Sequence, residues 1–294
     1  MRGAKTAWFL IWIAWPTLAG TGGFSGLQAL EFTERVVAFG PRLPGSQALE
    51  RLREWIVTHL RQWGWRVELD RFPAHTPRGV RTMVNILAHR AGETPSSVVI
   101  SGHYDTKELP GIHFVGANDG GSSTGFLLEM ARTLAAMPVR KSVWLVWFDG
   151  EEALEEWSEE DGLYGSRHLA SRWQRQGVLR QVEALINVDM IGDRELGIAK
   201  ERYSDPELVE LIWRTARELG YGPYFLQSTM AVLDDHIPFV RKGVRAVDLI
   251  DFDYGPGNRW WHTEQDTPDK LSARSFQVVG DVLLAVLERL GVFR

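Results

Sequence analysis

The sequence contains no cysteine among its 294 residues. Without thiol groups, the chain can form neither a disulfide bond nor a thiolate metal site. Any metal ion in this protein must therefore be held by histidine and carboxylate side chains, which zinc accepts as ligands.

Excess positive charge is also absent. The formal net charge is −5, and the lysines and arginines form no cluster along the chain. Nucleic-acid-binding surfaces are typically basic, so we expect no nucleic-acid partner. The chain also lacks internal repeats, low-complexity segments and linker-like stretches. We therefore predict one α/β domain that covers residues 26–294.

Long hydrophobic runs are missing except at the N-terminus. There, Arg2 and Lys5 precede an apolar run over residues 7–15, and Pro16 and small residues follow it. This is the layout of a secretory signal peptide, and the run is shorter than the roughly 20 residues of a membrane span. We predict a signal peptide over about residues 1–20 and export, either to a periplasm or as a secreted protein. An uncleaved N-terminal anchor is the alternative, and we expect no other stable membrane partner.

Helical and strand-like patterns alternate through the rest of the chain. The apolar spacing predicts helices over residues 26–39, 46–63, 122–136, 165–175, 205–219 and 273–290. Strands are predicted over residues 65–72, 82–89, 97–102, 142–148, 184–189 and 246–251. This alternation predicts an α/β fold, specifically a three-layer α/β/α sandwich with a mixed, centrally parallel sheet. The first two strands should form an antiparallel hairpin at the edge of that sheet.

Polar motifs follow three of the predicted strands at the point where each strand ends. The motifs are His103-Tyr-Asp105, Asp149-Gly-Glu151-Glu152 and the terminal Asp189. Ligands of open α/β sheets bind beyond the carboxyl ends of the central strands. Three such endings on one edge predict a functional site there.

The adjacent glutamates, Glu151 and Glu152, are the most informative of these residues. Two neighbouring carboxylates repel each other unless a cation or a proton compensates them. In a metal site, one carboxylate would bind the metal and the other would carry protons. The remaining candidate ligands are His103, Asp105, Asp119, Asp189, His236 and His262.

Taken alone, each candidate also has a structural explanation. His103 could be a partly buried histidine, Asp119 a turn residue in Asn-Asp-Gly-Gly, Asp189 a cap after its strand, and His262 a packed loop histidine. His236 begins a short helix in DDHIPF, and we assign it a structural role. The glutamate pair is hardest to explain in this way, because the strand before it is apolar and no cationic residue adjoins it in the sequence.

Together, these motifs resemble the zinc aminopeptidase superfamily with co-catalytic metal sites. Within that superfamily, three segments resemble the animal-type glutaminyl-peptide cyclotransferases: DGEEALEEWSEEDGLYGSRHLA, LDDHIPFVRKGV and WWHTEQDTPDKLS. The resemblance extends from about Phe32 to the C-terminus. It implies a zinc-dependent enzyme that converts the N-terminal glutamine of peptides or proteins to pyroglutamate and releases ammonia.

The resemblance also implies a role for each matching residue. Asp119, Glu152 and His262 would bind one zinc ion per chain, and Glu151 would be the general acid and base. Because the bound zinc would polarise the γ-carbonyl of the glutamine, the α-amine could attack the γ-carbon within the same residue.

Four further residues would complete this site. Asp189 and Asp234 would form a hydrogen-bonded acidic network with Glu151, and Trp157 and Trp261 would line the substrate pocket. The chain departs from the animal pattern at Asp248, which replaces a histidine. It departs also in its lack of cysteine and in a longer, more acidic loop over residues 251–260.

Two other functions remain open from the sequence. In a secreted di-zinc aminopeptidase, His103 and Asp189 would hold a second zinc, Asp119 would bridge the metals, and Glu151 would activate a water. The long loop that carries Trp157 favours the cyclotransferase, because ordinary aminopeptidases of the superfamily have a shorter connection there. A noncatalytic binding domain on the same scaffold would be expected to lose ligands that this chain retains.

Overall fold

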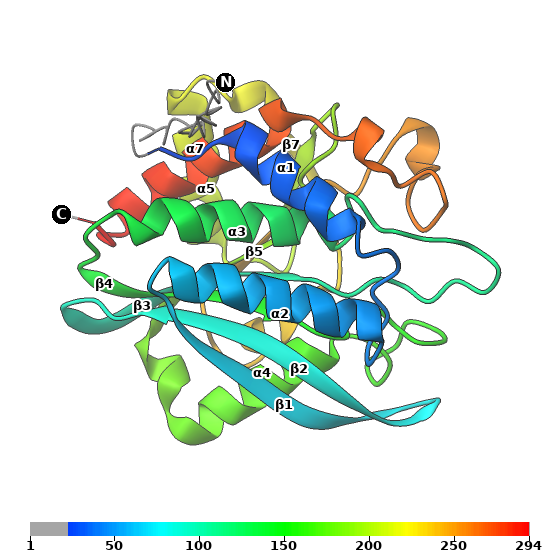
Figure 1. The fold of residues 1–294 in the computed structure, drawn as a ribbon. Coiled ribbons are helices and arrows are strands. Elements are labelled where there is room, and N and C mark those ends of the chain that lie inside the picture. The colour runs from blue at the N-terminus through cyan, green and yellow to red at the C-terminus, as the bar shows by residue number, and fades with distance from the viewer. Residues whose placement is uncertain (1–22, 294) are drawn as a thin grey trace, which may run out of the picture.

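The computed structural model describes residues 23–293 (Figure 1), so the predicted signal peptide lies outside the described residues. The helices are α1 (Gly26–Val37), α2 (Gln47–Gln62), α3 (Gly121–Ala135), α4 (Tyr164–Gln176), α5 (Pro206–Glu218), α6 (Ile237–Val240) and α7 (Ala273–Arg289). The strands are β1 (Arg66–Thr76), β2 (Gly79–Arg90), β3 (Thr94–His103), β4 (Lys141–Phe148), β5 (Val182–Asp189), β6 (Ile198–Glu201), β7 (Phe225–Met230) and β8 (Ala246–Ile250). Across residues 23–293, no helix combines the length and the hydropathy needed to cross a membrane.

Six strands form one sheet in the order β1-β2-β4-β3-β5-β8. The pairs β4-β3, β3-β5 and β5-β8 are parallel, whereas β1-β2 and β2-β4 are antiparallel. The predicted mixed sheet with a parallel centre and an antiparallel hairpin at its edge is therefore confirmed.

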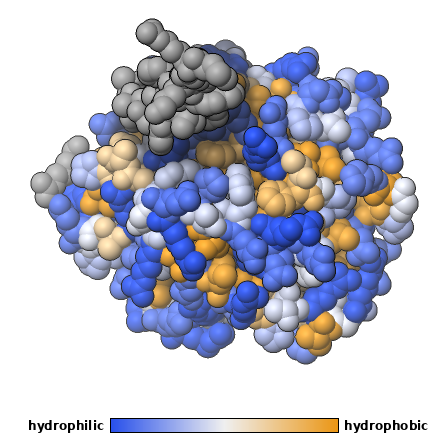
Figure 2. Space-filling model, in the orientation of Figure 1, coloured by the Kyte–Doolittle hydropathy of each residue, from blue (hydrophilic) through white to orange (hydrophobic). Residues whose placement is uncertain are grey.

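Helices cover both faces of this sheet, as the three-layer prediction requires. Buried side chains of α1, α2, α3, α5 and α7 form one core cluster with one face of the sheet. Side chains of α4 and α6 form a second cluster with the other face. Figure 1 shows α3 and α4 on opposite sides of the central strands. The face seen in Figure 2 is largely hydrophilic, with hydrophobic residues in small patches, because most apolar side chains are packed inside.

The edge hairpin is longer than the sequence pattern predicts. Its strands pair from Arg66 with His89 up to Thr76 with Gly79, which leaves a two-residue turn. The prediction ended the first strand at Phe72, directly before Pro73. Here Pro73 lies in the outermost strand, where its missing N–H leaves no ladder bond unmade.

A second, two-stranded sheet of β6 and β7 was not predicted. The four residues of β6 are too few to show an alternating pattern. Most of β7 is exposed and carries polar residues, so its sequence resembles a loop. Strand β6 contacts β8, the last strand of the main sheet.

The topology brings the three predicted motifs to one place. Strands β4, β3 and β5 are neighbours and run in the same direction, so the residues after Phe148, His103 and Asp189 share one edge. Helix α3 begins at Gly121, two residues after Asp119, and packs against β3.

Candidate functional site

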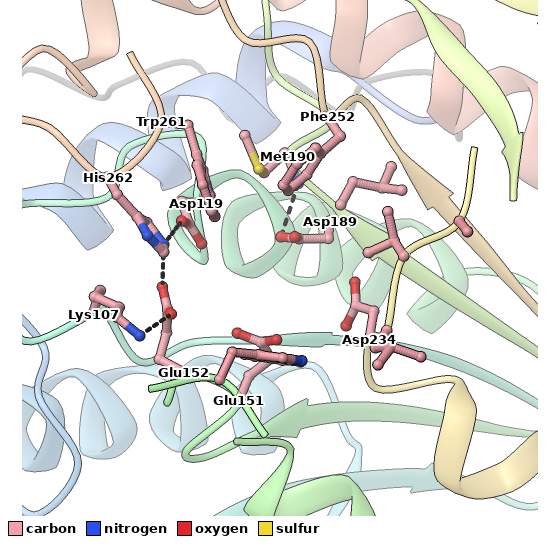
Figure 3. A pocket seen from close by; sticks show the side chains of 15 residues that line it. Lys107, Asp119, Glu151, Glu152, Asp189, Met190, Asp234, Phe252, Trp261 and His262 are labelled. Carbon is pink, nitrogen blue, oxygen red and sulfur yellow. Dashed lines mark hydrogen bonds and ion pairs between the residues drawn. The ribbon is translucent and has the colours of Figure 1, made fainter. Parts of the chain in front are cut away.

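A cavity of about 420 Å³ opens at this edge of the sheet (Figure 3). Polar groups form part of its wall: Lys107, Asp119, Glu151, Glu152, Asp189, Asp234 and His262. Apolar side chains form the rest: Trp157, Met190, Ala231, Val232, Leu233, Ile250, Phe252 and Trp261. A concave site with a few converging polar groups in an apolar wall is typical of a small-ligand site.

Three side chains converge as a candidate metal site. His262 Nε2 lies 3.1 Å from Asp119 Oδ2 and 3.1 Å from Glu152 Oε1 (Figure 3). One donor atom from each residue lies within 4.8 Å of the others. These are the three residues that the resemblance implied as zinc ligands.

The donor set fits zinc. Zinc bonds of about 2.0–2.2 Å in a tetrahedral arrangement place ligand atoms roughly 3.3–3.5 Å apart, close to the separations seen here. Burial alone would lower the pKa of His262, but the carboxylates of Asp119 and Glu152 raise it to about 10. Two carboxylates directed at one ring nitrogen therefore form a site that demands positive charge.

The loop before α3 holds Asp119 in place. Both carboxylate oxygens of Asp266 accept backbone hydrogen bonds, from Asn118 N at 2.8 Å and from Asp119 N at 3.1 Å. Tyr254 donates its hydroxyl to Asp266 Oδ1 at 2.7 Å. Asp266 thus fixes the backbone of a proposed ligand without facing the cavity.

Gly120 allows this loop to pass close to His103. Its φ of 74° lies in the left-handed region, and a Cβ added there would sit 2.9 Å from His103 Cε1. A larger residue would push the imidazole away from Asp119. The glycine is therefore required by both the turn and the close approach.

Aromatic contacts orient the imidazole of His262. Its ring stacks on Trp261 with centroids 4.0 Å apart, and Phe114 meets it edge-on at 5.7 Å. The backbone of His262 has φ of 53°, and Met190, which lies in the same apolar cluster as Trp261, has φ of 49°. Such left-handed conformations cost about 1–3 kcal/mol and tend to occur at functional sites.

The glutamate pair is fixed through its backbone. Asp105 Oδ1 accepts from Glu151 N at 3.2 Å, and Asp105 Oδ2 accepts from Glu152 N at 3.3 Å. Lys107 donates to Ala153 O at 2.7 Å, and its Nζ lies 3.7 Å from Glu152 Oε2. Lys107, in the loop after β3, thus supplies the positive charge that no sequence neighbour of Glu151 and Glu152 provides.

Glu151 faces the cavity beside the ligand cluster without belonging to it. Burial raises the pKa of its carboxyl well above the ordinary value, and the charges of Glu152 and Asp234 raise it further, while His103 opposes the shift. His103 Nδ1 lies 4.0 Å from Glu151 Oε2. A carboxyl that readily holds a proton next to a candidate metal site is suited to acid–base chemistry.

Asp189 and Asp234 line the same cavity as Glu151. Burial and the charge of Asp189 raise the pKa of Asp234 to about 6. Asp189 Oδ1 accepts hydrogen bonds from Met190 N and Ser123 Oγ, and His103 Nε2 lies 3.1 Å from it. Asp234 Oδ1 accepts from Asp235 N, and Oδ2 has no hydrogen-bond partner within residues 23–293, so the expected bond between Asp234 and Glu151 is not seen in this arrangement.

A second cluster surrounds His103. Its Nε2 lies 3.2 Å from Asp119 Oδ1 and 3.1 Å from Asp189 Oδ1, and the three residues also meet the distance requirement of a metal site. Asp119 belongs to both clusters. The arrangement that the aminopeptidase alternative needs is therefore present as well.

The two tryptophans differ in their surroundings. Trp261 packs against His262 and Phe252. Trp157 is 41% exposed and lies in the acidic loop between β4 and α4. That loop is held by Asp161, whose carboxylate accepts from Leu154 N and Glu155 N at 2.8 Å each.

His236, which we assigned a structural role, has buried structural contacts. Its Nε2 lies 3.0 Å from Glu201 Oε2, and its Nδ1 lies 4.0 Å from Asp248 Oδ2. Asp248, at the position where the sequence departs from the animal pattern, is fully buried and accepts from Asn187 Nδ2 at 3.1 Å.

Sequence reasoning missed the residues that act on the backbone of the site. Asp266, the contacts of Lys107 and the buried Arg42 had no signal in the sequence. Arg42 donates to the backbone carbonyls of Tyr104 at 3.2 Å and Gly116 at 2.9 Å, and so links the loop after β3 with the loop before α3. Asp105 was considered as a ligand, whereas the structure shows it bound to the backbone of the glutamate pair.

Comparison with known proteins agrees with this geometry. Residues 85–287 match the model of the family described as "Peptidase family M28". A Drosophila melanogaster glutaminyl-peptide cyclotransferase is 33% identical over 77% of this chain and 70% of its own length.

Solved structures give the same result. A glutaminyl cyclase from an Acidobacteriales bacterium superposes with a TM-score of 0.89 and 39% identity, over 95% of this chain and 98% of that chain. A zinc-dependent exopeptidase from Parabacteroides distasonis matches with a TM-score of 0.81 and 25% identity, over 90% of this chain and 98% of that chain. The chain therefore belongs to peptidase family M28 and, within that family, to the glutaminyl-peptide cyclotransferases.

Proposed function

We propose that this protein is a zinc-dependent enzyme that converts the N-terminal glutamine of peptide or protein substrates to pyroglutamate and releases ammonia. The observation that carries the proposal is the arrangement of the glutamate pair. Glu152 joins Asp119 and His262 in a cluster suited to one metal, and Glu151 faces the adjacent cavity with a raised pKa.

In this reaction, the α-amine nitrogen of the glutamine bonds to the side-chain amide carbon, and the bond from that carbon to the amide nitrogen breaks. Glu151 takes one proton from the attacking amine and delivers it to the leaving nitrogen, which departs as ammonia. The carboxyl of Glu151 returns to its starting state, so the protons balance. Attack within one residue gains from proximity, and the protein has mainly to hold the side chain folded.

Zinc bound by Asp119, Glu152 and His262 would supply Lewis-acid polarisation of the side-chain carbonyl. We propose one zinc ion per chain. Asp189 Oδ1 already has donors at Met190 N and Ser123 Oγ and lies 3.1 Å from His103 Nε2, which supports its use as an acceptor rather than as a ligand.

The apolar wall has a separate task in this proposal. Trp157, Trp261 and Phe252 would pack against the aliphatic part of the glutamine and exclude water from the reacting carbon. The charge of Asp234 would help to keep the pKa of Glu151 high, so that the carboxyl can hold the transferred proton, and the charge of Asp189 raises the pKa of Asp234 in turn.

The function is tested with two peptides that differ only in the first residue. We expect the zinc-loaded protein to release ammonia from the Gln-initiated peptide and no free amino acid from the Leu-initiated peptide. Released leucine would support the di-zinc aminopeptidase, for which the His103 cluster is the specific observation. Neither product, together with a metal-free purified protein, would support the noncatalytic binding domain.

We also propose that the protein is exported, on the strength of the sequence pattern over residues 1–20. Cell fractionation with N-terminal sequencing tests this. A mature chain that begins near residue 20, found in the periplasm or the medium, is the expected result. A full-length chain in the membrane fraction would support the uncleaved anchor.

A further inference from the structure

A second hollow adjoins the proposed active-site cavity. It has a volume of about 220 Å³ and shares two wall residues, Trp157 and Leu233, with the larger cavity. Each of these side chains is 41% exposed. They therefore form a ridge, open to solvent, that separates the two spaces.

The hollow continues away from the active site. Arg167 lines it and also lines a further surface depression beside Phe72 of β1 and His168 of α4. The larger cavity, the second hollow and this depression are thus linked by shared wall residues. Such a series is suited to an extended chain rather than to a compact ligand.

The charges of the second hollow are mainly positive, although the protein as a whole carries −5. Its wall contains Arg167, Arg241 and Lys242 but only one carboxylate, Glu159. Arg241 is already paired with Glu159, at 2.7 Å. Arg167 and Lys242 therefore have no carboxylate partner in this wall.

These two cations contact neutral oxygens. Lys242 Nζ donates to the side-chain amide of Gln174 at 2.8 Å. Arg167 donates at 2.9 Å to the backbone carbonyls of Glu159 and Glu160, and its guanidinium lies over the ring of Tyr164. Within residues 23–293, neither cation has a carboxylate within 4.0 Å. Both are held in place and retain their charge for a ligand.

The geometry of cyclisation explains why the substrate chain would reach the second hollow. All bonds that form and break belong to the first residue, so the cavity has to enclose only the glutamine. The rest of the peptide must leave the cavity over its rim. The ridge of Trp157 and Leu233 is an exposed part of that rim, and the second hollow lies directly beyond it.

We propose that the second hollow is a substrate subsite for an acidic side chain, one or two residues after the N-terminal glutamine. This inference rests on the proposed function. Lys242 and Arg167 would attract the carboxylate, and the ridge would support the peptide backbone between the two sites. Peptides with Glu or Asp soon after the glutamine would then be the preferred substrates.

The test uses tripeptide and tetrapeptide amides that begin with glutamine and carry Glu, Ala or Lys at the second or third position. We expect the Glu peptide to exceed its Lys counterpart roughly three- to tenfold in kcat/KM at one of these positions, mainly through a lower KM. This range corresponds to one or two solvent-exposed charge pairs. The preference should weaken as salt is added.

Charge variants separate a local subsite from the overall field of the protein. Lys242→Gln should reduce the preference to about twofold or less, and Lys242→Glu should reverse it in favour of the Lys peptide. Arg61, an exposed residue of α2 in the opposite helical layer, provides the matched control. Arg61→Gln and Arg61→Glu should leave the preference unchanged.

Equal kcat/KM for the Glu and Lys peptides would overturn the subsite, and so would equal effects of the Arg61 and Lys242 variants. The Ala peptide separates this failure from a failure of the proposed function, since a true cyclotransferase converts it whether or not the subsite exists. If no peptide reacts, calorimetric titration still tests the subsite. Tighter binding of the Glu peptide would support it, and equal binding would overturn it.

Discussion

Glu151 and Glu152 are neighbours in the chain but face different partners. The carboxylate of Glu152 lies 3.1 Å from His262 Nε2 and 3.7 Å from Lys107 Nζ. Glu151 instead faces His103 and buried carboxylates. Its burial and the charges of Glu152, Asp234 and Asp235 raise its pKa, while His103 opposes the shift. In the proposed function, Glu152 therefore binds the metal and Glu151 transfers the proton.

Replacing Glu151 by glutamine tests its proposed role in proton transfer. Because the amide cannot accept the proton of the attacking amine, we expect kcat to fall by about 10²- to 10⁴-fold. Zinc content, measured by atomic absorption, should stay at one per chain. Glu152→Gln is the matched control and should lose zinc, as should Asp119→Ala and His262→Ala. Full activity of Glu151→Gln would contradict the assignment.

Zinc binding should release protons. In the metal-free protein, the carboxylates of Asp119 and Glu152 raise the pKa of His262 to about 10, so its ring is protonated at neutral pH. Zinc needs the neutral imidazole and therefore displaces that proton. We expect the affinity for zinc to rise with pH from neutral towards 10. Calorimetry in buffers of different ionisation enthalpy should detect about one proton or more per zinc at pH 7. Binding without proton release would contradict this account of the metal-free site.

At the scale of elements, a buried carboxylate ties the cavity wall to the second sheet. Glu201, at the end of β6, accepts from Val232 N at 3.4 Å through Oε1 and lies 3.0 Å from His236 Nε2 through Oε2. Residues 231–234 line the cavity between these two contacts. This contact pattern gives the irregular segment before α6 a fixed position.

We therefore expect Glu201→Ala to be strongly destabilising. Removing the carboxylate leaves the buried His236 Nε2 and the N–H of Val232 without their partner. Each buried polar group left unsatisfied costs about 1–3 kcal/mol of unfolding free energy, which urea denaturation would measure. Amide hydrogen exchange should also increase in residues 231–236. Glu129→Ala is the control, since Glu129 is fully buried and accepts from Ser25 N at 2.8 Å, at a site outside the cavity wall. It should lower stability without faster exchange in that segment. Unchanged amide hydrogen exchange of residues 231–236 in the Glu201 variant would contradict the claim that Glu201 fixes this segment.

At the scale of the whole molecule, one buried aspartate connects the edge hairpin with the helical layer behind it. Asp70 of β1 lies 2.8 Å from Arg172 Nη1 and 3.3 Å from His168 Nε2, both on α4. Burial alone would raise the pKa of Asp70, but the hydrogen bonds and charges of His168 and Arg172 lower it below the ordinary value.

This shift predicts a specific loss of stability in acid. A carboxyl with a lower pKa in the folded state stabilises the fold above its unfolded pKa, near 4, and this contribution disappears as the pH falls through the folded pKa. We expect Asp70→Asn to be less stable at pH 7 and to lose less stability between about pH 5 and pH 2. Thermal unfolding across that range would measure the difference. If the stability of the variant and of the parent protein fell equally between pH 5 and pH 2, the predicted contribution of Asp70 would be contradicted.

The sheet and the ligand cluster could be predicted from the sequence for one physical reason. Parallel strands that are buried on both faces give clear apolar runs, and the polar residue after each run marks the carboxyl edge. That is why His103, Glu152 and Asp189 could be placed together before the structure was known. The resemblance selected Asp119 and His262 from the other candidate ligands, because both lie on loops whose paths no local pattern determines.

The rest of the architecture depends on contacts distant in the sequence. Strands β6 and β7 have little apolar pattern, because most of β7 is exposed. Asp266 and Asp105 bind backbone N–H groups that only the folded loops bring to them. An acidic residue with such a role is indistinguishable in the sequence from a surface carboxylate or a metal ligand.

The central claim is that the α-amine of the substrate displaces its own side-chain amide nitrogen. A Gln-initiated peptide labelled with nitrogen-15 in that amide tests this directly by mass spectrometry. We predict that the label leaves entirely as ammonia, that the unlabelled α-nitrogen stays in the pyroglutamyl product, and that Glu151→Gln prevents both. Free labelled glutamine, with a peptide shortened by one residue, would contradict the claim and identify the protein as an aminopeptidase.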